Sequence, residues 1–223
     1  MQKNKLNKIL LLLVGFSAGA LFGGAFLHLI PESLNSLSSD LVGVSVMLGF
    51  AFFFIIERVL RWNHCHKYGE NCEVHSFKYL NLIGDGIHNF IDGLIIATSF
   101  VVDFKLGIAT TLAVVIHELP QEISDFGVLV YGGFSRKKAL LFNFLSALIA
   151  ILGVIIGFFL SSYVENISSW LLPFAAGGFI YIAASDLVPE LHKEHNIKKS
   201  FLSFFLSVLG VLFMWLMKQV LAV

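Results

Sequence analysis

Seven stretches of roughly 20 or more mostly apolar residues follow one another along the chain, and short polar segments separate them. A helix that crosses a bilayer needs a stretch of this length. The pattern therefore predicts an all-α polytopic membrane helix bundle, in which residues 1–223 form a single membrane domain. The predicted spans are residues 6–30, 41–62, 77–102, 106–131, 139–163, 167–191 and 201–223.

The composition supports a membrane protein. Hydrophobic residues make up 57% of the chain and charged residues only 13%, and the mean hydropathy is +0.83. Soluble domains carry about 25% charged residues. Two cysteines cannot form the disulfide framework of a small secreted fold.

Positive charges alternate between the two sides of the predicted bundle. Apart from Lys105 and Lys218, every Lys and Arg lies on one side: before the first span, or in or beside alternate loops. Loops rich in Lys and Arg remain in the cytoplasm. We therefore predict a cytoplasmic N-terminus and an outer C-terminus in a plasma or inner membrane.

The spans at 77–102 and 106–131 carry polar and ionisable residues at helical spacing. Residues three or four apart share one face of a helix. Since few residues join the two spans, they are antiparallel neighbours whose polar faces can meet at similar depth. The first span contributes Asp85, His88, Asn89 and Asp92, and the second contributes His117, Glu118, Gln121, Glu122 and Asp125.

Pro120 interrupts the polar part of the second of these spans. Proline has no backbone N–H, so the carbonyl of Ile116 loses its helical donor. The sequence therefore predicts a free carbonyl there, and a kink in the helix.

Ionised side chains inside a bilayer require compensation, at a cost of at least ~3 kcal/mol each near its centre. A divalent cation supplies it. Imidazole nitrogen together with carboxylate oxygen suits zinc, iron or manganese. The spans lack cysteine, which argues against Cu(I), and Mg²⁺ favours all-oxygen shells. The alternative is that these groups only join helices by hydrogen bonds.

The motifs "HNFIDG" (residues 88–93) and "HELPQEISD" (117–125) resemble the signatures of the ZIP (Zrt/Irt-like) divalent metal-ion transporters. The subgroup with HNFxDG and HExPHExGD motifs is the most similar. Segments 19–33, 56–62 and 176–190 also resemble the family, so the resemblance covers essentially the whole chain.

The resemblance implies a two-metal site in the middle of the membrane. It assigns His88, Asp92, His117 and Gln121 to the primary site, and Asn89, Glu118 and Asp186 to the second. Glu122 matches an acid close to both. Gln121 departs from the family pattern, which has His or Glu at this position, and an amide is the poorer ligand.

The resemblance also implies that the chain moves Zn²⁺, and also Fe²⁺, Mn²⁺ or Cd²⁺, toward the cytoplasm, with a mobile helix bundle sliding against a scaffold. Family members form homodimers and have eight spans with both termini outside. Here seven spans are predicted, and the match begins at the family's second span, so the first is missing from the match.

Two other functions remain open at this stage. His117 and Glu118 begin an H-E-x-x-H pattern of intramembrane metalloproteases, but Gln121 stands where that chemistry needs a second histidine. A metal sensor without flux is the other. The loop at 63–76, predicted to be cytosolic, contains three His and two Cys and could bind delivered ions.

Overall fold

The computed structural model describes residues 3–62, 74–131, 133–163, 167–194 and 196–221, and this part of the chain contains helices and no strand. The elements are α1 (Lys3–Gly23), η1 (Gly24–Leu29), α2 (Ile30–Ser33), α3 (Ser39–Trp62), α4 (Val74–Val102), α5 (Phe104–Tyr131), α6 (Arg136–Ala147), α7 (Ile149–Tyr163), α8 (Ile167–Ile182), η2 (Ala183–Leu187), α9 (Val188–His192) and α10 (Ile197–Leu221).

These elements confirm the predicted all-α membrane bundle. Six segments are long and apolar enough to cross a membrane: 11–33, 39–59, 82–102, 136–161, 167–192 and 197–221. They correspond to six of the seven predicted spans. The seventh, α5, has 28 residues, which is long enough to cross, but it is not among the six. That α5 crosses as well stays a prediction.

Two of the composite spans contain a π-helical turn just before a proline. In the first span η1 precedes Pro31, and in the sixth η2 precedes Pro189. Proline removes one helical hydrogen bond, and a widened turn accommodates the loss without ending the helix. The two turns hold His28 in η1 and Asp186 in η2.

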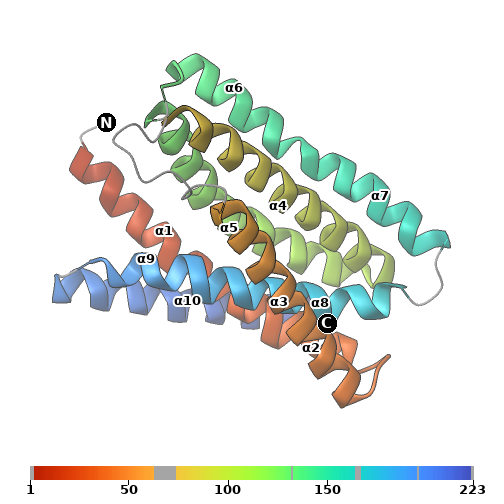
Figure 1. The fold of residues 1–223 in the computed structure, drawn as a ribbon. Helices are drawn as coiled ribbons and strands as arrows, with labels where there is room; N and C mark the ends of the chain where they lie inside the picture. The colour runs from red at the N-terminus through yellow and green to blue at the C-terminus, as the bar shows by residue number, and fades with distance from the viewer. Residues whose placement is uncertain (1–2, 63–73, 132, 164–166, 195, 222–223) are drawn as a thin grey trace.

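Three pairs of helices cross at close range: α1 with α10, α3 with α8, and α4 with α7 (Figure 1). Glycines permit each approach. A Cβ on Gly49 of α3 would collide with the backbone of Phe174, and one on Gly153 of α7 would collide with the backbone of Phe90. Small residues let membrane helices pack backbone to backbone, where dispersion forces are strongest.

The helices form two groups. One contains α4, α5, α6 and α7, and the other contains α1, α3, α8, α9 and α10 (Figure 1). Helix α5 packs against α4 in its own group and against α1 in the other. The main core lies where the groups meet and includes Leu21, Leu106, Phe179 and Met214. Any polar side chain on this side of α4 or α5 is therefore enclosed by helices.

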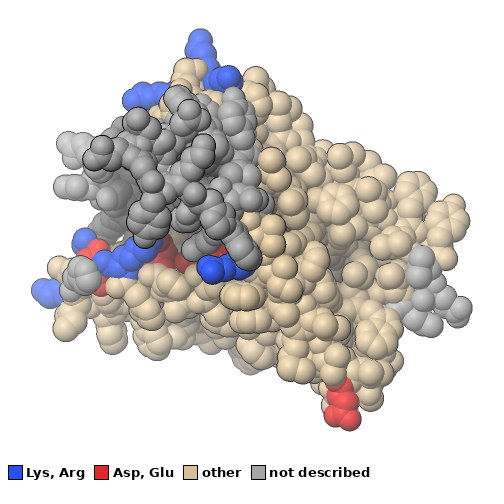
Figure 2. Space-filling view, viewed as in Figure 1, with Lys and Arg blue, Asp and Glu red and all other residues tan. Residues whose placement is uncertain are grey.

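The outer face is apolar and almost free of charge over most of its length. Exposed large hydrophobic side chains cover α3, α7 and α10, as a surface in contact with lipid requires. In the view of Figure 2, Lys and Arg gather at the end of the bundle where α6 begins and α9 ends. This end is the one that the loop charges predict to be cytoplasmic.

The helix crossings predict different outcomes for two glycines of α3. Gly49→Ala should lower the thermal unfolding midpoint in detergent, because its Cβ would meet the α8 backbone, an overpacking cost of about 1–3 kcal/mol. Gly43→Ala is the matched control, since nothing lies within 4 Å of a Cβ there, and it should leave the midpoint unchanged or raise it. Equal midpoints for both variants would contradict the close crossing.

Candidate metal centre

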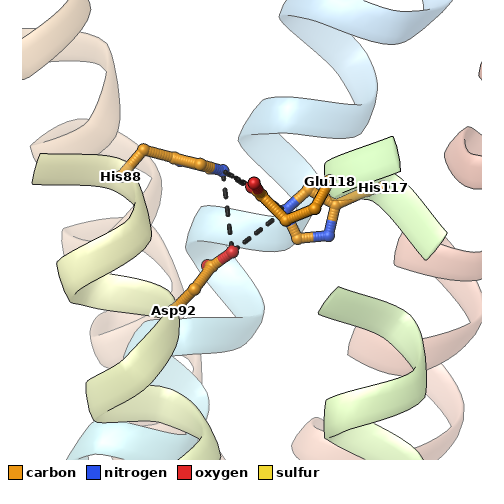
Figure 3. Close-up of side chains that lie close together, drawn as sticks. All are labelled: His88, Asp92, His117 and Glu118. Atoms are coloured by element: carbon orange, nitrogen blue, oxygen red, sulfur yellow. Dashed lines mark hydrogen bonds and ion pairs between the residues drawn. The ribbon is translucent and has the colours of Figure 1, made fainter. Parts of the chain in front are cut away.

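Four side chains from α4 and α5 point to one spot between the two helices (Figure 3). His88 and Asp92 are one turn apart on α4, and His117 and Glu118 are adjacent on α5. Each offers one ligand atom, and the four atoms lie within 4.8 Å of one another. The site is deeply enclosed: the side chains of His117 and Asp92 are 0% and 1% exposed, and those of His88 and Glu118 only 12% and 15%.

The spacing of these atoms fits a tetrahedral ion. Nε2 of His88 lies 3.7 Å from Asp92 Oδ2, 3.2 Å from Glu118 Oε1 and 3.2 Å from His117 Nε2. Nε2 of His117 lies 3.1 Å from Asp92 Oδ2 and 3.5 Å from Glu118 Oε1. Ligands placed 2.0–2.1 Å from zinc at tetrahedral angles are about 3.3–3.4 Å apart. The set of two nitrogens and two oxygens therefore matches the shell of Zn²⁺.

A backbone bond fixes the tautomer of His117. Its Nδ1 lies 3.0 Å from the carbonyl oxygen of Ala113, which can only accept, so Nδ1 donates. In the neutral imidazole, Nε2 then presents a lone pair toward Asp92, and both oxygens of Asp92 are buried without a hydrogen-bond donor. Two acceptors face each other, and only a cation between them removes the conflict.

The backbone of α5 is held in place by α1 at the same level. Ser17 on α1 donates a hydrogen bond of 2.7 Å to the carbonyl of Ile116, the carbonyl that Pro120 leaves without its helical donor. The predicted free carbonyl therefore has a partner. Since Ile116 precedes His117 directly, the same bond helps to position the imidazole.

Aromatic rings enclose the two imidazoles. The ring of Phe53 on α3 meets His88 edge to face at a centroid distance of 6.3 Å, and Phe179 on α8 meets His117 at 5.9 Å. These rings leave little room for water, and electrostatic attraction is stronger where water is excluded. An ion here is held mainly by the protein.

A second group of acids adjoins the first. Asp85, Glu118 and Glu122 each bring a carboxylate oxygen within 4.8 Å of the others. Glu118 belongs to both groups. Glu122 accepts a hydrogen bond from Asn143 of α6, and Asn89 donates to Oδ1 of Asp85 at 3.0 Å. The two groups form one continuous polar cluster.

The structure thus brings together His88, Asp92, His117 and Glu118, with Glu122 and Asn89 beside them. Gln121 is half-buried and lies beside Asp85. Asp186 is exposed in η2 and belongs to neither group of ligand atoms. Its place in a second metal site, implied by the resemblance, stays a prediction. The loop at 63–76 falls mostly outside the described residues.

Two residues of the cluster were not among the predicted ligands. Asp85 shares the helical face of His88 and Asp92, so periodicity signals its position, but the family motif does not include it. Asn143 comes from α6, some 20 residues after Glu122 in the chain, and its side chain is 6% exposed. Nothing local in the sequence links it to the acids of α5.

The fold and the site define a class: a polytopic membrane helix bundle with a buried site suited to a first-row divalent metal ion. The sequence profile of the ZIP zinc transporter family matches residues 1–76 and 62–218. The chain therefore belongs to the ZIP family, a family of transporters and not of enzymes. Family membership leaves the metalloprotease alternative without support.

Three relatives illustrate the similarity. The chain is 35% identical to the zinc transporter zipt-7.1 of Caenorhabditis briggsae, over 83% of this chain and 63% of the relative. It is 33% identical to the zinc transporter YKE4 of Saccharomyces cerevisiae, over 85% and 63%. It is 34% identical to the zinc transporter ZIP13 of Pongo abelii, over 91% and 65%. The chain thus spans less than two thirds of the length of these relatives.

The geometry predicts a tetrahedral Co²⁺ spectrum. Co²⁺ replaces zinc in such shells, and tetrahedral Co²⁺ absorbs visible light strongly, whereas octahedral Co²⁺ absorbs weakly. We expect strong visible bands with one equivalent of Co²⁺, lost in His117→Ala and retained in the exposed control His192→Ala. To keep ions off the 63–76 loop, all chains carry His64→Ala, Cys65→Ser, His66→Ala, Cys72→Ser and His75→Ala. This background is the loop-substituted chain. Retention of the bands in His117→Ala would contradict the site.

Proposed function

We propose that this chain transports divalent transition-metal ions, zinc foremost, across a membrane toward the cytoplasm, through the site formed by His88, Asp92, His117 and Glu118. The observation that carries the proposal is the convergence of two imidazole nitrogens and two carboxylate oxygens at tetrahedral spacing between α4 and α5. The names of the relatives, all zinc transporters, support zinc as the ion.

The position of the site favours transport over storage. It lies inside helices whose outer faces suit lipid, away from the charged end of the bundle. An ion that is bound there has lost most of its water and is reached from either side only along the helix faces. A shell of four neutralising ligands compensates the loss of hydration, as conduction through a membrane requires.

The site chemistry also admits other ions. Nitrogen and carboxylate ligands accept Fe²⁺, Mn²⁺ and Cd²⁺, and affinity for divalent first-row ions rises from manganese through iron toward zinc. We therefore propose zinc first, with iron, manganese or cadmium as weaker substrates. The sharing of Glu118 between two groups of ligand atoms supports the two-metal site expected for the family.

The orientation belongs to the same proposal. The Lys-rich and Arg-rich end of the bundle would face the cytoplasm, with the N-terminus inside and the C-terminus outside, in a plasma or inner membrane. A homodimer remains a family-level expectation. A sensor that binds metal without flux is the competing function.

Uptake into proteoliposomes tests the function. The chain should carry Zn²⁺ into vesicles that contain a fluorescent zinc indicator, faster than empty vesicles do. His88→Ala removes a ligand atom of the site and should abolish uptake, whereas the exposed His192→Ala should retain it. Equal uptake by His88→Ala would refute the site. Zinc binding to the chain without any uptake would instead support the sensor.

A further inference from the structure

We infer that Asp85, Glu118 and Glu122 form a separate all-oxygen metal site, which receives the ion from the nitrogen-containing site and which Asn143 of α6 holds in shape. This inference rests on the proposed function and adds the composition and chemistry of the second site. It differs from the ligand set that the family resemblance implies, since it uses Asp85 in place of Asn89 and Asp186.

The three carboxylates occupy one layer of the bundle. Asp85 lies one turn before His88 on α4, and Glu122 lies one turn after Glu118 on the antiparallel α5. Their oxygens approach within 4.8 Å although like charges repel. Asn89 donates to Oδ1 of Asp85, so that carboxylate is oriented and its other oxygen faces elsewhere.

Burial without donors indicates a missing cation. Asp85 is only 5% exposed, and its Oδ2 is buried without a hydrogen-bond partner. The same holds for Oε1 of Glu118 and Oε1 of Glu122. Each group of ligands thus has an oxygen that no protein donor satisfies. Buried carboxylate oxygens in this condition are strongly unfavourable unless a cation binds them.

The charges of the whole cluster call for two divalent ions. Four carboxylates, on Asp85, Asp92, Glu118 and Glu122, lie in the two groups that share Glu118. With both imidazoles neutral, as metal ligands must be, the formal charge of the cluster is that of the four acids. One divalent ion balances half of it, and a second at the oxygen site balances the rest.

Asn143 is a positioning residue of this second site. Its Nδ2 donates to the carboxylate of Glu122 and also to the backbone oxygen of Glu122 at 3.0 Å. These two bonds fix both ends of the Glu122 side chain from a different helix. Ser146, one turn further along α6, lies beside Asp85. Partners behind a ligand typically contribute about 10–100-fold to metal affinity.

The difference in ligands gives the ion a direction. Zinc gains from imidazole, whereas a shell of carboxylates suits harder ions such as Mn²⁺ and binds zinc less tightly. The oxygen site lies on the side of the bundle where α6 begins, the side predicted to be cytoplasmic. Glu118 contacts both positions and can pass an ion from the tighter site to the weaker one, from which release is easier.

Sequential binding of two different ions tests the oxygen site. The loop-substituted chain in detergent receives one equivalent of Zn²⁺, and Mn²⁺ is then titrated while electron paramagnetic resonance measures the free Mn²⁺. We expect one Mn²⁺ per chain. Asp85→Asn and Glu122→Gln, which keep the shapes of the side chains, should weaken Mn²⁺ binding by at least about tenfold and leave zinc affinity unchanged.

Further variants separate ligands from positioning residues. Glu118→Gln should weaken the binding of both ions, because Glu118 belongs to both groups. Asn143→Ala should weaken Mn²⁺ by about 10–100-fold with zinc affinity intact, which a general loss of folding would not produce. The control Asp40→Asn removes an exposed acid of α3 and should change neither affinity.

The outcomes distinguish this inference from the proposed function. Wild-type Mn²⁺ binding by Asp85→Asn, or the absence of bound Mn²⁺ beside tightly bound zinc, would overturn the oxygen site alone. A parallel loss of zinc and Mn²⁺ in folded Asp85→Asn would also overturn it, since the two sites would be one. Zinc affinity that His117→Ala does not change would overturn the proposed function itself.

Discussion

Acids and imidazoles enclosed by helices in a bilayer must find their compensating charge within the bundle, because hydrocarbon provides none. The arrangement of α4 and α5 follows from this constraint. His88 and Asp92 of one helix face His117 and Glu118 of the other, and their ligand atoms converge at the spacing of a tetrahedral ion. The polar cluster therefore depends on a cation, and the cation depends on the alignment of two helices.

The other helices serve this alignment. Ser17 of α1 bonds the carbonyl that Pro120 leaves without a donor, directly before His117. Glycine crossings bring α7 against α4 and α8 against α3, so the backbones themselves limit how far each helix can shift. Rings of Phe53 and Phe179 enclose the imidazoles. The site is thus built by helices from both groups of the bundle.

The two groups of ligand atoms suggest how tight binding and release can coexist. An ion held only by imidazole and carboxylate at ideal spacing would leave slowly. A neighbouring shell of oxygens alone offers a weaker position one helical turn away, and Glu118 is common to both. Ion movement then needs small rearrangements of side chains in addition to any movement of helix groups. Gln121, the departure from the family pattern, lies beside this weaker position.

The sequence by itself determined the helices, the apolar surfaces and the faces of α4 and α5 that carry the ligands, because hydrophobic runs and helical spacing are local properties. It also identified His88, Asp92, His117 and Glu118. Only the tertiary structure decided that Asp85 and Asn143 join the cluster and that Asp186 lies outside both groups of ligand atoms. These outcomes depend on how far and at what angle distant helices approach, which glycine contacts across the bundle set and no local pattern encodes.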